Sequence, residues 1–159
     1  MQDASKRRFL VQLLAALAGV TAASRHGFAQ AKLPLVVYKD PSCGCCQFWV
    51  EYMQRQGYKL TVYNSGMEAI KAQHKIPPVL QSCHTTLVGG YVIEGHVPAS
   101  DIAKLLTEKP KGIIGLTIPG MPASAPGMDQ VPFRPYTVLT FDAKGQTKTY
   151  AVHSKPSRP

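Results

Sequence analysis

The sequence predicts a mixed α/β fold, and three local patterns carry this prediction. A short apolar run at 33–38 stops before Asp40-Pro41-Ser42, which is typical of a buried strand. Residues 48–53 repeat apolar side chains at helical spacing, and Gly57 is the expected stop. Two further apolar runs flank Gly89-Gly90, which indicates a β-hairpin.

The remaining elements complete one order along the chain. We expect a second strand at 59–63, a short helix at 67–74, hairpin strands at 85–88 and 91–93, and a helix at 98–107. The resulting order, β-α-β-α-β-β-α, is that of a thioredoxin-like domain. Right-handed crossovers make its first two strands parallel, and the hairpin adds an antiparallel pair.

The composition changes after Pro110. Residues 112–129 are rich in Gly and Pro and contain the triplet Pro-Gly-Met twice, so we expect an ordered surface loop without helix or strand. A C-terminal β-hairpin follows, with strands at 136–141 and 147–152, and a disordered tail is expected after His153.

The N-terminal residues are typical of an export signal. Lys6-Arg7-Arg8 forms a basic segment of twin-arginine type, and a short apolar stretch at 10–20 leads to a small-x-small cleavage site at Ala29-Gln30-Ala31. A lysine in the first of the two arginine positions leaves the twin-arginine and general secretion routes both open. The apolar stretch is too short to span a membrane comfortably. We therefore expect a periplasmic protein without stable membrane insertion after the signal is cleaved.

These boundaries predict three segments. They are an export signal at 1–31, a thioredoxin-like domain at 32–110, and a loop, hairpin and tail at 111–159 packed on the same domain. The formal net charge is +9, but no Lys/Arg block interleaves with aromatic residues, so nucleic acid is not an expected partner. The sequence also lacks a phosphate-binding loop, a Ser/His/Asp arrangement and paired carboxylates, which disfavours hydrolysis and phosphoryl transfer.

The four cysteines are the most informative residues of the chain. Cys43, Cys45 and Cys46 lie within four residues, and Cys83 is followed by His84. In the expected topology the turn after the first strand, the loop entering the third and the loop leaving the fourth meet at one end of the sheet. The three cysteines, the pair Cys83-His84 and His96 should therefore converge there.

Crowded thiolates either exchange disulfides or hold a soft metal. A helix start beside the cysteines favours the thiolate form. Four sulfurs, with a histidine completing the coordination, suit Cu(I), and bridging thiolates would hold more than one ion; Zn²⁺ is the main competitor. Because neighbouring side chains of a strand point to opposite faces, His84 is a less secure ligand than the cysteines. Met121 and Met128, in the two Pro-Gly-Met triplets, are further candidates through their thioether sulfurs.

Two alternatives to a metal site stay open. A pair of disulfides, such as Cys43–Cys46 with Cys45–Cys83, would be a structural or resting oxidised state. The C-x-x-C spacing of Cys43 and Cys46 would also suit a thiol–disulfide oxidoreductase. Such enzymes do not need a third sulfur, and they usually place a cis-proline before the third strand, where this chain has Ser82-Cys83.

Several separated motifs of the chain occur together, in the same order, in one known family. They are 38–46 with Trp49 and Met53, Cys83-His84-Thr85, Gly90-Tyr91, 94–99, Gly115-Leu116, 119–122 and 126–128. Through these motifs, which cover approximately residues 33–129, the chain resembles the family of exported CopG-like copper-resistance proteins, long catalogued as a domain of unknown function.

The resemblance implies a thioredoxin-like fold and copper handling in the periplasm. It implies that Cys43, Cys45, Cys46 and Cys83 bind copper or pass between thiol and disulfide. Copper ions, and another periplasmic copper-handling protein, are the partners to expect. Whether the chain is an enzyme, with copper or thiol–disulfide redox activity, is left open.

Overall fold

The computed structural model of the chain describes residues 32–129 and 131–156. The expected export signal lies outside these residues, as does the end of the expected tail. Among the described residues, no helix has the length and apolar content that crossing a membrane requires.

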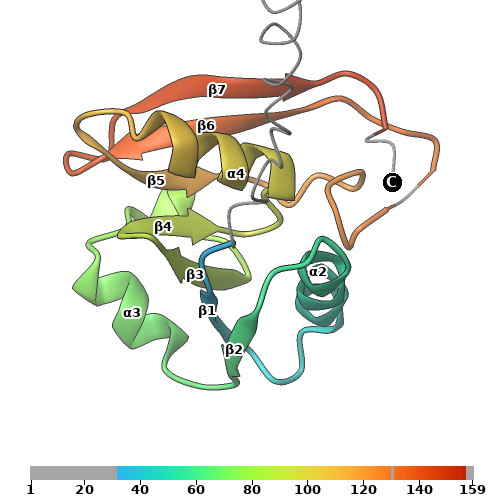
Figure 1. Cartoon of the computed structure of the whole chain (residues 1–159), viewed down its shortest axis with the longest axis horizontal. Coiled ribbons are helices and arrows are strands. Elements are labelled where there is room, and N and C mark those ends of the chain that lie inside the picture. The colour runs from blue at the N-terminus through green and yellow to red at the C-terminus, as the bar shows by residue number, and fades with distance from the viewer. Residues whose placement is uncertain (1–31, 130, 157–159) are drawn as a thin grey trace, which may run out of the picture. The chain divides into compact units, whose positions relative to one another are not determined.

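Within the described residues, the fold is a seven-stranded sheet with three α-helices (Figure 1). The strands are β1 (Leu35–Lys39), β2 (Leu60–Tyr63), β3 (His84–Val88), β4 (Tyr91–Glu94), β5 (Ile113–Thr117), β6 (Tyr136–Asp142) and β7 (Thr147–His153). The helices are α2 (Gly44–Arg55), α3 (Met67–Gln73) and α4 (Ala99–Glu108), with a 3₁₀ turn, η1, at Pro78–Leu80.

The sheet has the order β2-β1-β3-β4-β5-β6-β7. β1 pairs in parallel with β2 and antiparallel with β3, and β3 pairs antiparallel with β4 through the expected Gly89-Gly90 turn. β4 and β5 are parallel, and the last three strands are antiparallel. The structure thus confirms a mixed α/β fold, the parallel first pair and both predicted hairpins.

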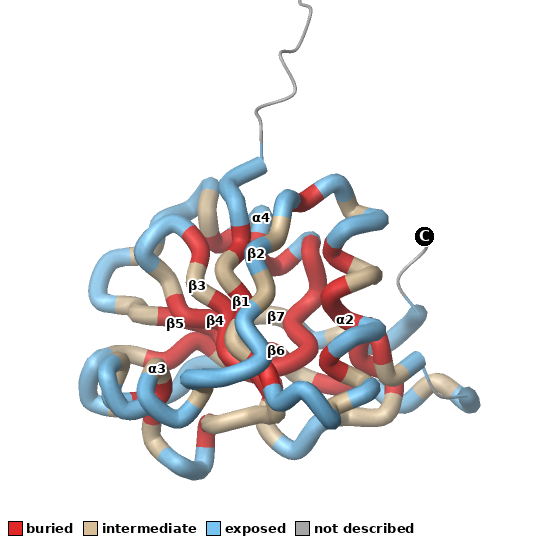
Figure 2. The backbone as a smooth tube through the Cα atoms, turned by 90° about the horizontal axis from the view of Figure 1, so that it is seen from below, coloured by how far each residue is buried: buried red, intermediate tan, exposed pale blue. Residues whose placement is uncertain are grey.

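Apolar residues are buried on both faces of the sheet. Val92 and Ile93 are neighbours on β4 and point to opposite faces, as the period of a strand requires. Ile93 belongs to the larger core, which takes Trp49 from α2 and Ile102 from α4, whereas Val92 belongs to a smaller core with Leu80 of η1. Figure 2 shows the buried segments gathered around the strands, with exposed residues at the periphery.

The prediction of a strandless surface loop at 112–129 is wrong in two respects. Residues 113–117 form β5, a central strand whose Leu116 is fully buried, because β4 and β6 supply hydrogen bonds on its two sides. Gly115 interrupts the apolar run and hides the strand signal in the sequence. The rest of the segment is irregular, but Ile118 and Ala125 are buried, so it is partly a core element.

Candidate metal centre

The C-G-C-C segment is presented by a tight turn between β1 and α2. Asp40 Oδ1 accepts hydrogen bonds from Ser42 N–H at 2.7 Å and from Ser42 Oγ at 2.6 Å. These bonds lower the pKa of Asp40 and hold the turn in shape. Cys43 is the N-cap residue of α2, so the next two cysteines fall in the first helical turn.

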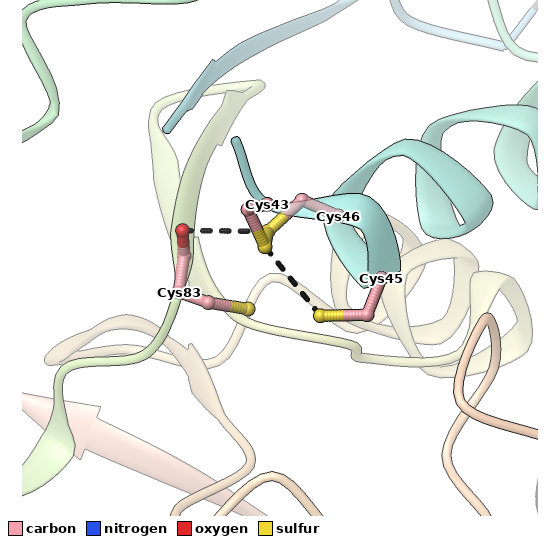
Figure 3. Close-up of side chains that lie close together, drawn as sticks. All are labelled: Cys43, Cys45, Cys46 and Cys83. Carbon is pink, nitrogen blue, oxygen red and sulfur yellow. Dashed lines mark hydrogen bonds between the residues drawn. A yellow bond between two sulfur atoms is a disulfide. The ribbon is translucent and has the colours of Figure 1, made fainter. Parts of the chain in front are cut away.

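The structure brings all four cysteine sulfurs within 4.8 Å of one another (Figure 3). Cys43 and Cys46 form a disulfide, with their Cα atoms 5.4 Å apart, while Cys45 and Cys83 are free. Cys45 Sγ lies 3.4 Å from Cys43 Sγ. Cys83 directly precedes β3 and faces the helix start from across the site, so the predicted convergence of two distant segments is confirmed.

Two histidines extend the cluster inward. Cys46, Cys83, His84 and His96 form a second group with potential ligand atoms within 4.8 Å of one another. His84 Nδ1 lies 3.5 Å from Cys83 Sγ, and His96 Nε2 lies 3.4 Å from the same sulfur. Strand alternation does not separate His84 from Cys83, because β3 begins at His84 and Cys83 lies before the strand.

A backbone carbonyl orients His96. The carbonyl oxygen of Pro126 lies 2.7 Å from His96 Nδ1, and because a carbonyl only accepts, Nδ1 carries the proton. The lone pair of the neutral ring is then on Nε2, the atom nearest Cys83 Sγ. The second Pro-Gly-Met segment thereby contributes to the site through the backbone of its proline.

Burial sets the protonation states of the metal-free site. It raises the pKa of Cys83 to about 11, with the adjacent Cys45 as a further cause. It also lowers the pKa of His84 well below its ordinary value, with His96 and Lys71 acting in the same direction. The pKa of His96 is lowered by burial as well, although Pro126 opposes the shift. The site therefore holds a protonated Cys83 and neutral imidazoles at neutral pH.

The two methionines lie in different surroundings. Met121 is exposed, and Met128 is partly buried against the larger core. Neither placement tests their sulfurs as ligands, and the metal-binding role of the cysteines and histidines also stays a prediction.

Sequence reasoning missed three groups that support the site. One is the Pro126 carbonyl, which leaves no signal in a side-chain pattern. The others are Glu94 and Lys71, which form a buried ion pair beside Ser82 and Cys83. The apolar neighbours of Glu94 in its strand were the available signal, since an isolated carboxylate among them requires a buried partner.

The donor atoms fit a soft metal ion. Thiolates and neutral imidazoles are ligands of Cu(I) and of Zn²⁺, and one ring nitrogen of each histidine, Nδ1 of His84 and Nε2 of His96, lies within 3.5 Å of Cys83 Sγ. Cys43 and Cys46 become donors only after their disulfide is reduced.

Comparisons with known proteins agree with these observations. Residues 80–128 match the sequence model of a family described as "Protein of unknown function, DUF411". A solved structure of copper resistance protein CopG, form 1, is 35% identical, with a TM-score of 0.70, and the match covers 77% of this chain and 98% of that one. Form 2 gives a TM-score of 0.69 at the same identity and coverage. No curated protein matches the chain. The protein belongs to the CopG-like family of copper-resistance proteins.

Proposed function

We propose that this protein binds copper as Cu(I) through Cys43, Cys45, Cys46 and Cys83 and contributes to copper tolerance. The observation that carries the proposal is the convergence of four sulfurs within 4.8 Å from two distant segments. Cu(I) favours thiolate ligands in low coordination numbers, and closely spaced thiolates bridge ions, so the cluster has the capacity for more than one. The family relationship to copper resistance protein CopG supports copper over zinc.

Binding is coupled to proton release in this proposal. The thiolate is the ligand form of cysteine, and the pKa of Cys83 is raised to about 11, so an arriving ion must displace its proton. His84 and His96 are neutral and need lose no proton to donate from a free ring nitrogen. The thioether sulfurs of Met121 and Met128 are further candidate donors.

Redox cycling is the second part of the proposal. Two thiolates that form one disulfide release two electrons, which reduce two Cu(II) ions to Cu(I) with no other reactant. In the reverse direction, two Cu(I) ions supply the two electrons that cleave the disulfide. The Cys43–Cys46 pair is placed for this exchange, because Cys45 lies beside it and Cys83 completes the cluster.

We also propose that the protein acts in the periplasm, where it would exchange copper with another copper-handling protein. The basic segment, apolar stretch and cleavage site within residues 1–31 support export. We further propose that the first four strands and three helices form a thioredoxin-like unit. The strand order β2-β1-β3-β4, with one parallel and two antiparallel pairings, supports this description.

One observation favours a second candidate, a thiol–disulfide oxidoreductase. Cys43 and Cys46 form a C-x-x-C disulfide at the start of α2, which is the arrangement of a redox pair. Such an enzyme would catalyse reduction of a model protein disulfide and would depend mainly on one cysteine of that pair. The copper proposal requires Cys83 as well.

Anaerobic Cu(I) titration of the reduced chain from Lys32 onward tests the proposal. Metal analysis after competition with a Cu(I) chelator should give tight retention of at least one ion per chain. Cys83→Ser should abolish tight retention, whereas His74→Ala, which changes a half-buried histidine outside both ligand groups, should not. Weak copper binding together with efficient insulin reduction would instead support the oxidoreductase.

A further inference from the structure

A buried ion pair lies next to Ser82, the residue that precedes Cys83. Lys71 Nζ of α3 lies 2.6 Å from Glu94 Oε2 of β4, and the two side chains are 3% and 0% exposed. Burying two charges costs more than such a pair usually returns in stability, so the pair calls for a specific role. Neither residue belongs to the candidate ligand groups of the copper site.

The Glu94 carboxylate has a partner on each oxygen. Its Oε1 accepts the Thr85 hydroxyl at 2.5 Å, and its Oε2 accepts Lys71 and also the backbone N–H of Ser82 at 2.8 Å. Lys71 donates to the Thr85 hydroxyl as well, at 2.9 Å. The network thus ties α3 and β3 to the residue immediately before Cys83.

The last residue of β4 and the two residues after it contact residues 82–84, the segment that contains Cys83. Glu94 binds the Ser82 N–H, and Gly95 donates its N–H to the His84 carbonyl at 3.0 Å. A Cβ on Gly95 would overlap the Ser82 side chain, with 2.8 Å to its Cβ, so only glycine allows this approach. His96 then reaches the Cys83 sulfur. Three consecutive residues of one segment therefore contact three of the other.

We propose that Glu94 is the positioning residue of the copper site, holding the Ser82 amide so that Cys83 meets the cysteines of α2. Cys83 is the one cysteine that the C-G-C-C turn does not place, so its position depends on its own backbone. Lys71 acts through Glu94 by balancing its charge. This allows a carboxylate that is buried away from water to accept the Ser82 N–H. This inference rests on the proposed copper function.

Two double variants separate the effect of the hydrogen bond to Ser82 from the effect of the Lys71 and Glu94 charges. Lys71→Met with Glu94→Gln removes both charges and keeps an oxygen that accepts the Ser82 N–H. Lys71→Met with Glu94→Leu removes the same charges and the acceptor. Loss of a group that orients a metal ligand typically costs about 10- to 100-fold in affinity, so we expect that loss for the leucine variant, with wild-type affinity largely retained by the glutamine variant.

Three measurements make the comparison decisive. Cu(I) competition gives the affinity, the thiolate-to-Cu(I) absorption band reports sulfur ligation, and mass spectrometry gives the iodoacetamide alkylation rate of Cys83 without metal. The leucine variant should lose affinity, show a weaker band and alkylate faster at Cys83. Equal affinities, bands and alkylation rates in two folded variants would overturn the inference while wild-type copper binding still stood.

One further measurement needs no variant. In the wild-type chain, hydrogen exchange should show the Ser82 amide strongly protected, because its proton is held by a buried carboxylate. Exchange of that amide at the rate of an unprotected loop would overturn the inference even if the leucine variant failed to fold. Absence of Cu(I) binding in the wild type would contradict the proposed function instead. The exchange rate of the Ser82 amide would still test whether Glu94 holds that amide.

Discussion

His84 is fully buried between an aromatic ring and a second histidine. Its ring centroid lies 4.6 Å from that of Trp49 and 5.0 Å from that of His96. A protonated imidazole would carry an unsolvated charge there, so burial lowers its pKa and the folded protein keeps it neutral. This has a measurable consequence for the metal-free protein.

Stability of the metal-free protein should fall as the pH drops below about 6.5, the ordinary pKa of histidine. Below that pH the unfolded chain binds a proton at His84 that the folded chain excludes, so the free energy of unfolding decreases with decreasing pH. His84→Phe keeps an aromatic ring and removes the titration. Between about pH 6.5 and 5, wild type should lose up to about 1.4 kcal/mol per pH unit more than the variant.

Urea denaturation across this pH range measures the difference. His96 remains in both proteins, so its own contribution largely cancels when the two pH profiles are subtracted. Parallel profiles for wild type and His84→Phe would contradict a buried neutral His84.

The tautomer of His96 is a second prediction at the scale of one residue. The Pro126 carbonyl requires a proton on Nδ1, so Nε2 should carry the lone pair in the metal-free protein. Long-range proton–nitrogen NMR correlations distinguish the two ring nitrogens by chemical shift. A proton found on Nε2 would exclude the orientation described here.

At the scale of elements, the two Pro-Gly-Met triplets have different roles. Both glycines have positive φ, 76° at Gly120 and 81° at Gly127. A Cβ at Gly120 would meet nothing within 4 Å, whereas at Gly127 it would lie 2.6 Å from the backbone nitrogen of Trp49 in α2. The second triplet therefore packs against the helix that carries the cysteines, and it also supplies the Pro126 carbonyl.

The matched substitutions Gly120→Ala and Gly127→Ala test this difference. Each places alanine at positive φ, which costs about 1 to 2 kcal/mol. Only Gly127→Ala adds a clash with helix backbone, which should cost about 1 to 3 kcal/mol more. Thermal and urea unfolding should rank Gly127→Ala as clearly less stable, and equal losses would argue against the close contact with α2.

The helices and strands with a regular local pattern of apolar residues were the ones that the sequence predicted. α2 and α4 were predicted because their apolar residues repeat at helical spacing, and the β3–β4 hairpin because Gly89-Gly90 separates two apolar runs. β5 was missed because a five-residue strand with a central glycine has a weak pattern. Its partners β4 and β6 are what make it a strand.

At the scale of the whole molecule, one sheet joins β1 and β3, the strands next to the two cysteine segments, to the C-terminal hairpin. Val138 of β6 is fully buried in the larger core, and Phe141 of the same strand is fully buried in the smaller one. β7 is tied back to α4, because His153 Nε2 lies 2.7 Å from Asp101 Oδ2. The hairpin is thus an integral part of both cores.

A chain that ends after Asp129 should therefore fail to fold cooperatively. It would expose apolar residues of both cores and leave β5 as an edge strand that pairs only with β4. Circular dichroism and thermal melting should show no cooperative transition, and the dye ANS should bind. A chain ending at His153 is the control, since residues 154–156 are exposed, and it should melt like the full chain.

The α/β class, the order of the first elements and the gathering of the cysteines at one end of the sheet could be predicted from the amino-acid sequence. These follow from local spacing and from the handedness of chain connections, which act within short segments. The tertiary structure was needed to show that residues 113–117 are a strand, that Pro126 orients His96 and that Glu94 holds Ser82. Each of these depends on a partner distant in sequence, and hydrogen bonds between such partners leave no periodic pattern in the chain.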